Sequence, residues 1–123
     1  MHVTTVACGA AAVSLLVAVA APSSQPSRRV IAVSAERFAF TPSRIEVAPG
    51  EEVELQIKSA DTAHGFRIVG TDTNVAIPKR GKGARSVVVR LREPGTYTFE
   101  CSRMCGAGHH FMRGEIVVRP GGQ

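Results

Sequence analysis

The sequence predicts an all-β domain, a Greek-key β-sandwich, preceded by a hydrophobic N-terminal segment. Apolar and polar residues alternate over short runs, and Pro-Gly or glycine-bearing turns separate these runs. No helical pattern is evident after the N-terminal segment. Seven or eight short strands at regular turn intervals are typical of a β-sandwich. The chain of 123 residues is long enough for one such domain.

The start of the chain is apolar and uncharged, since all 15 basic and all 10 acidic residues follow Ser27. Val3–Ala21 is an almost unbroken run of small and aliphatic residues, close to the ~20 that span a bilayer as a helix. It closes with Ala18-Val19-Ala20, which fits a signal-peptidase site. Both interpretations place the domain on the extracytoplasmic (periplasmic) face, membrane-anchored or exported. We expect three parts: a hydrophobic anchor or signal segment (1–21), a Pro/Ser tether (22–28) and a folded domain (29–123).

The first half of the domain predicts four strands. The clearest lies in Glu51–Ser59, where Val53, Leu55 and Ile57 alternate with polar residues and form one apolar face. Turns are expected at Thr41-Pro42-Ser43 and at Pro49-Gly50. The other three expected strands are 29–34, 36–40 and 44–47.

The second half continues the same pattern after a break at residues 59–65. A basic, glycine-bearing loop spans Lys79–Arg85, and Glu93-Pro94-Gly95 forms another turn. A solvated charge run is the ordinary interpretation of such a basic loop, and anionic lipid is an alternative contact. The expected strands are 66–69, 86–92, 96–100 and 113–119, and 75–77 is a short apolar run that ends at Pro78.

A cluster of metal-binding residue types follows the strand at 96–100. Cys101, Cys105, His109 and Met112 have the spacing Cys-x3-Cys-x3-His-x2-Met. Thiolate, imidazole and thioether groups together favour soft or borderline metals, copper first among them. His64 lies at a break between two strands, and sandwich loops collect at the two ends, so it can reach this segment.

Three other interpretations of this cluster remain open from the residues alone. Zinc could be held by the two histidines and the two cysteines, a legitimate tetrahedral set that leaves Met112 unexplained. A mononuclear blue-copper site would leave one cysteine spare. A disulfide between Cys101 and Cys105 would leave both histidines idle and would close only a small loop.

From about Phe38 to Val118 the sequence resembles the CuA domain of cytochrome c oxidase subunit II, a cupredoxin, and most closely the short form found in B-type oxidases. The four-residue ligand spacing is the most specific part of the resemblance. The other matching stretches are Phe40-Thr-Pro-Ser-Arg-Ile-Glu-Val, Ala-Pro49-Gly50-Glu, Asp61-x-x-His64-Gly-Phe and Pro94-Gly-Thr-Tyr.

The resemblance implies a binuclear copper centre. Its cysteines would bridge two copper ions, one histidine would bind each ion, and two weak ligands would complete the set. The implied metal ligands are His64, Cys101, the backbone carbonyl of Arg103, Cys105, His109 and Met112. Asp61 is expected to orient the His64 loop. Phe66 and Phe111 are expected to shield the site from water.

The resemblance also implies a role in electron transfer, with no catalysis by this chain alone. The domain would take electrons from a cytochrome c or cupredoxin and pass them to subunit I of a haem-copper oxidase in a respiratory chain. No nucleic-acid partner is expected for an exported domain, despite the net charge of +5. A free-standing CuA-type carrier, a copper-handling relative and a zinc- or disulfide-stabilised binding module are the alternatives.

Two features depart from the family pattern. Many subunit II sequences carry a glutamate that helps to bind magnesium at the position of Arg103, and arginine cannot do so. The chain also has no tryptophan, so Phe38 or Phe40 would have to replace the aromatic patch at which the family receives electrons. The basic charge predicts a donor that is acidic or docks through apolar contacts, because cationic cytochromes c dock on acidic patches.

Overall fold

The computed structural model describes residue 2 and residues 9–23 and 27–120. Within these residues the chain forms nine strands and one short 3-10 helix, in the order β1 (Arg29–Glu36), β2 (Ala39–Thr41), β3 (Arg44–Val47), β4 (Glu52–Ser59), β5 (His64–Ile68), β6 (Asn74–Ile77), β7 (Ala84–Arg90), β8 (Gly95–Glu100), η1 (His109–Phe111) and β9 (Arg113–Val118). The all-β prediction is therefore confirmed.

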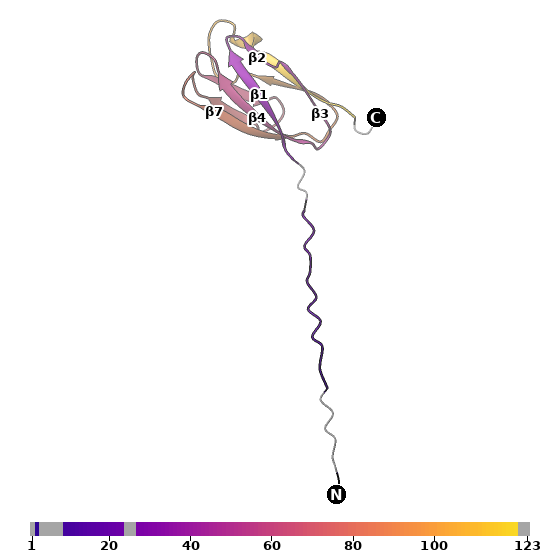
Figure 1. The fold of residues 1–123 in the computed structure, drawn as a ribbon. Helices are drawn as coiled ribbons and strands as arrows, with labels where there is room; N and C mark the ends of the chain where they lie inside the picture. Colours follow the sequence, from indigo (N-terminus) through magenta and orange to yellow (C-terminus); the bar gives the residue numbers. More distant parts are fainter. Residues whose placement is uncertain (1, 3–8, 24–26, 121–123) are drawn as a thin grey trace.

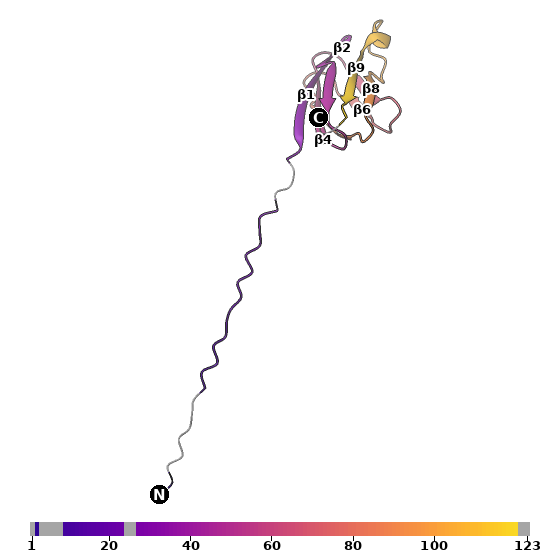
Figure 2. The same ribbon diagram turned by 90° about the vertical axis from the view of Figure 1, so that its right-hand side faces the viewer.

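The strands form two mixed sheets that pack face to face (Figures 1 and 2). One sheet has the order β2-β1-β4-β7, and the other has the order β3-β9-β8-β5-β6. The pairs β1–β4 and β3–β9 are parallel, whereas the other neighbours are antiparallel. Consequently β1, β4, β8 and the start of β5 bring their connections to one end of the sandwich.

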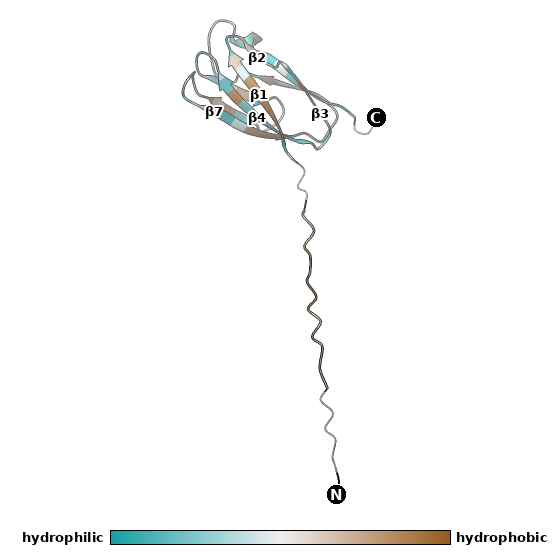
Figure 3. Ribbon diagram, viewed as in Figure 1, coloured by the Kyte–Doolittle hydropathy of each residue, from teal (hydrophilic) through white to brown (hydrophobic). Residues whose placement is uncertain are grey.

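Alternating side chains build the core between the sheets. In β4, Val53, Leu55 and Ile57 are buried, as the sequence predicts, and the alternation of apolar and polar residues is visible along the strands (Figure 3). Phe40, Phe66 and Phe99 form an aromatic cluster with ring centroids 5.1–5.7 Å apart. Such aromatic contacts add to the stability that burial alone provides.

One expected strand is interrupted. The sequence predicts a strand over 36–40, but β1 ends at Glu36 and β2 begins at Ala39, with a turn at Arg37 and Phe38. The turn forms because the Arg37 backbone N–H donates to Asp61 Oδ2 at 2.9 Å, outside the β1–β2 ladder. A tertiary contact therefore overrides the local alternation.

The expected N-terminal helix is not confirmed. Residues 9–23 have no regular secondary structure and extend away from the start of β1 (Figure 1), while residues 3–8 and 24–26 lie outside the described residues. In the part of the chain that the structure describes, no helix combines the length and apolar character needed to cross a bilayer. An isolated segment of this length has little helical stability without a surface or lipid against which to pack.

Candidate metal centre

Four connections meet at the end of the sandwich that lies opposite the N-terminal segment (Figures 1 and 2). They join β1 to β2, β4 to β5, β6 to β7 and β8 to β9. His64 is the first residue of β5, and residues 101–112, the cysteine loop, join β8 to β9. The Cys101 backbone N–H donates to the Met112 carbonyl at 3.0 Å and closes this loop. We call this end of the sandwich the ligand end.

The structure brings His64, Cys101 and Cys105 together in a buried cluster. Their donor atoms all lie within 4.8 Å of one another, and the His64 side chain has no solvent exposure. The two cysteine sulfurs are 3.7 Å apart and both thiols are free. A disulfide needs about 2.05 Å, so the two sulfurs remain available as separate metal ligands.

The remaining sequence-predicted ligands adjoin the same sulfurs. His64 Nδ1 lies 3.9 Å from Cys101 Sγ, and His109 Nδ1 lies 3.7 Å from Cys105 Sγ. The sulfur of the buried Met112 lies 3.9 Å from Cys105 Sγ. The carbonyl oxygen of Arg103 lies 3.0 Å from Cys101 Sγ. Each thiol therefore has one imidazole beside it, and all six predicted groups adjoin one small volume.

His109 does not belong to the group of three donors that lie within 4.8 Å of one another, although it is close to Cys105. The structure thus places His109 beside Cys105 and His64 beside Cys101. One zinc ion bound by all four groups remains the alternative to two copper ions.

Asp61 orients His64 by a direct contact. Asp61 Oδ1 lies 2.7 Å from His64 Nε2, so Nε2 carries the shared proton and Nδ1 is left to face the sulfurs. Burial alone would raise the pKa of Asp61, but hydrogen bonds from the Arg37 amide, the His64 ring and the Thr62 amide lower it to about 2. Asp61 is thus a carboxylate at neutral pH.

Burial raises the pKa of the Cys105 thiol to about 11, and the neighbouring Cys101 adds to the increase. Without a metal ion the Cys105 thiol therefore keeps its proton at neutral pH. Binding of a cation would replace that proton, because thiolates are the metal-binding form of cysteine.

Glycines allow the close packing of the cysteine loop. A Cβ at Gly65 would lie 2.1 Å from Ser102 Oγ and 2.9 Å from the Arg103 nitrogen. A Cβ at Gly108 would lie 2.3 Å from the Phe38 ring, and one at Gly106 would lie 2.9 Å from it. The loop is therefore held against β5 on one side and against the Phe38 ring on the other.

Arg37 is a site residue that the sequence analysis missed. Its Nε donates to the Cys105 carbonyl at 2.6 Å, and its backbone N–H donates to Asp61. One residue of the β1–β2 turn thus contacts both the cysteine loop and the carboxylate that orients His64. The sequence offers little indication of this role, because the alternation around Arg37 predicts an ordinary strand residue that faces solvent.

Two expectations for aromatic residues were wrong. Phe111 does not shield the site: its side chain is 83% exposed, because the 3-10 turn points it outward while Met112 is buried. Phe40 is buried in the core and cannot receive electrons at the surface, whereas Phe38 is half-buried beside the loop. Phe66 packs in the core cluster with Phe40 and Phe99, and its expected role in shielding the site stays a prediction.

The donor set fits copper. Two thiolates, two imidazoles and a thioether are ligand types that bind copper in preference to harder cations. The buried Met112 sulfur lies 3.9 Å from Cys105 Sγ, and zinc would leave it without a role.

A family profile described as "Cupredoxin-like domain" matches residues 9–118 of the chain. The chain is 38% identical over 95 residues to two proteins named cytochrome c oxidase subunit 2 from Thermus thermophilus. These 95 residues are 76% of the chain and cover 68% of one relative and 55% of the other. A chain in the cryo-EM structure of a heme-copper terminal oxidase dimer is 28% identical, with a TM-score of 0.65 over 74% of this chain and 65% of that one.

The fold also matches the periplasmic domain of cytochrome oxidase subunit II (CoxB) from Bradyrhizobium japonicum. The TM-score is 0.68 at 16% identity, over 78% of this chain and 88% of that one. A similarity at this level of identity shows the fold alone. Together with the identity to the Thermus proteins, these matches show that the chain belongs to the cupredoxin-like family and, within it, to the subunit II type of cytochrome c oxidase.

Proposed function

We propose that this chain carries a binuclear copper centre that takes electrons from a soluble donor and passes them to a haem-copper oxidase. The observation that carries the proposal is the pairing of one imidazole with each of two free thiols whose sulfurs are 3.7 Å apart. When bound, two copper ions supply a site that takes up and releases one electron. The subunit II relatives support partnership with subunit I of a haem-copper oxidase. The donor that we propose is a cytochrome c or a cupredoxin.

The residues of this chain would hold such a centre in a fixed geometry. Cys101 and Cys105 would bridge the ions, and His64 and His109 would each bind one. Met112 and the Arg103 carbonyl would be the weak outer ligands. The pairing of His64 with Cys101 and of His109 with Cys105 supports two ions, since each sulfur has its own imidazole beside it.

Copper analysis combined with electron paramagnetic resonance tests this proposal on the purified chain. We expect two copper ions per chain and a hyperfine pattern from two equivalent copper nuclei. A Cys105→Ser variant should give the pattern of one nucleus, because it removes one of the two bridges. One zinc ion per chain after expression with both metals supplied, or an oxidised copper protein with no resonance, would refute the binuclear assignment.

The location of the domain is a second part of the proposal. Residues 1–21 would form a helical membrane anchor or signal segment, 22–28 the tether and 29–123 the periplasmic domain. Supporting this, five large apolar side chains in Val13–Val19 are 75–96% exposed and have no protein surface against which to pack. Such a run is covered by lipid or removed by processing. Mass spectrometry of the N-terminus, with membrane fractionation, distinguishes a retained anchor from a cleaved signal.

A further inference from the structure

The positive charge of the chain is concentrated at the ligand end. Four connections form this end, and they carry eight of the 15 basic residues but only three of the 10 acidic ones. The other seven basic residues are balanced by seven acidic residues elsewhere in the chain. The net excess of five positive charges therefore lies in these four connections. The four connections, with their flanking strand ends, are residues 36–39, 58–65, 77–85 and 100–113.

The three acidic residues of this end offset little of its exposed positive charge. The Asp61 carboxylate accepts hydrogen bonds from His64 and from the Arg37 amide. Glu100 is paired with Arg67 and Arg113. Only Glu36 is an exposed carboxylate here. Among the described residues, no ion pair neutralises the exposed cations of this end, which are Arg37, Lys58, Lys79, Arg80, Lys82, Arg85 and Arg103.

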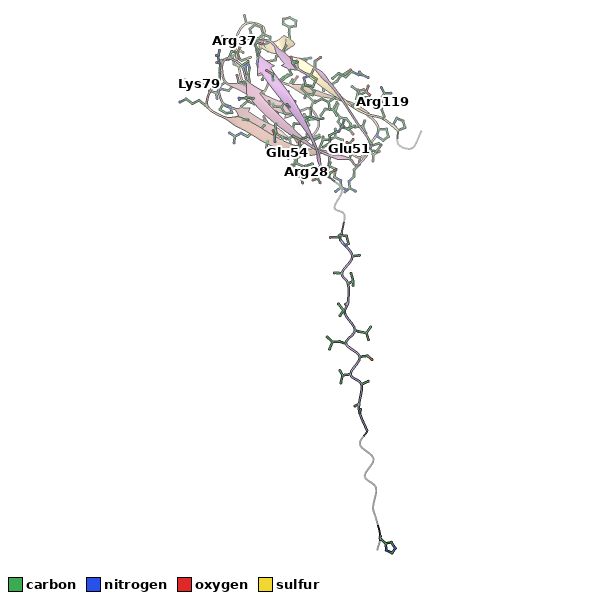
Figure 4. The ribbon with its side chains drawn as sticks, in the orientation of Figure 1. Arg28, Arg37, Glu51, Glu54, Lys79 and Arg119 are labelled. Atoms are coloured by element: carbon green, nitrogen blue, oxygen red, sulfur yellow. The ribbon has the colours of Figure 1, made fainter. Side chains whose placement is uncertain are left out.

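The opposite end contrasts with this arrangement. Arg28 pairs with Glu52 and Arg29 with Glu51, where the N-terminal segment meets the domain. Figure 4 shows Arg28, Glu51 and Glu54 near that junction, while Arg37 and Lys79 lie at the far, ligand end. The exposed cations named above thus lie at one end of the sandwich, and the paired charges named here lie at the other.

Two exposed apolar side chains also belong to the ligand end. The side chains of Met104 and Phe111 are 68% and 83% exposed, and both belong to the cysteine loop. His110 is exposed, and its ring packs edge-on against the half-buried His109 with centroids 5.3 Å apart. A proposed metal ligand therefore reaches the surface through His110 within this face.

We propose that the ligand end is a docking surface for an electron donor whose own contact face is acidic. This inference rests on the proposed function and names the class of its donor. Two apolar side chains at an end that carries seven exposed cations are too few for the largely apolar interface of a permanent complex. They suit a short-lived encounter, in which opposite charges speed association and a small apolar contact allows close approach. A cationic cytochrome c would be repelled.

Native and succinylated cytochrome c provide matched probes of opposite charge. Succinylation converts the lysines of cytochrome c to carboxylates and retains the haem. The copper-loaded full-length chain, oxidised and held in a neutral detergent, is mixed with each reduced cytochrome in a stopped-flow instrument. At low ionic strength we expect the succinylated donor to react at least about tenfold faster. High salt should remove most of this advantage, because it screens exposed charges.

Two charge reversals of equal size locate the effect. Lys79→Glu lies at the ligand end, and Arg92→Glu lies beyond the last residue of β7, at the other end. Both side chains are exposed and have no ion-pair partner among the described residues. Lys79→Glu should reduce the advantage of the succinylated donor several-fold, whereas Arg92→Glu should leave it nearly unchanged.

The proposal is overturned if native cytochrome c reacts as fast as the succinylated form, or if both reversals have equal effects. It is also overturned if phosphatidylglycerol vesicles bind through Lys79 while neither cytochrome is preferred, since the surface then recognises lipid. Reduction by neutral hydroquinone separates this outcome from failure of the proposed function. A chain that hydroquinone reduces, but that shows no charge preference, refutes only the docking surface. A chain that no reductant reduces refutes electron transfer itself.

Discussion

The contact between Phe38 and Gly108 makes a sharp prediction about the cysteine loop. A methyl group at Gly108 would lie 2.3–2.7 Å from three atoms of the Phe38 ring, including Cγ. Carbon atoms in contact prefer about 3.5–4.0 Å, so the ring or the loop must move by roughly 1.2 Å. The φ angle of Gly108 is −92°, which alanine adopts without strain. Gly108→Ala therefore isolates the steric effect.

We expect Gly108→Ala to lower the free energy of unfolding by about 1–3 kcal/mol, the usual cost of overpacking. The displacement should also reach His109, the next residue, and so alter the copper site. Urea unfolding of the metal-free chain measures the first effect. Electron paramagnetic resonance and the visible spectrum of the copper-loaded chain measure the second.

A double-mutant cycle supplies the control. In Phe38→Ala the ring is absent, so adding Gly108→Ala should cost little more and the two effects should not be additive. Additive losses, or an unchanged stability in Gly108→Ala alone, would show that the Phe38 ring does not confine the loop. A copper spectrum identical to that of the wild-type chain would show that the loop moves without disturbing the ligands.

Three further predictions follow from the geometry. Asp61→Asn keeps the shape but loses the carboxylate that orients His64, and copper affinity measured by chelator competition should fall about 10–100-fold. Phe99→Ala removes a fully buried ring and should cost about 3–5 kcal/mol in urea unfolding, without changing the copper stoichiometry. The hydrogen bond from Arg119 lowers the pKa of Glu46 below its ordinary value of 4.5. Its contribution to stability is present above that value and is lost as the pH falls below it, so Glu46→Gln should make the loss of stability below pH 4.5 shallower.

The sequence predicted the fold and the donor set well where the pattern is local. Alternation along β4 identified Val53, Leu55 and Ile57 as buried, and the spacing of the cysteine loop identified residues that the structure brings together. Contacts between distant segments were not predictable. The turn at Arg37 exists because of Asp61, 24 residues away, and nothing in the alternation around Phe38 indicates it. Phe111 was misjudged because an aromatic residue near a ligand is usually buried, whereas here a 3-10 turn reverses its direction.

The β1–β2 turn explains how two separate segments can form one site. Arg37 reaches His64 through Asp61 and reaches the cysteine loop through the Cys105 carbonyl, while the adjacent Phe38 ring covers Gly106 and Gly108. None of these contacts involves a metal ion. The donor groups are therefore held near their final positions by the protein itself, and little rearrangement should accompany metal binding or a change of charge on the metal. For a centre that exchanges electrons, this rigidity is the useful property, because groups that do not move add little to the barrier for electron transfer. The same turn lies within the cationic ligand end, so the residues that fix the ligands also contribute to the surface a donor would meet.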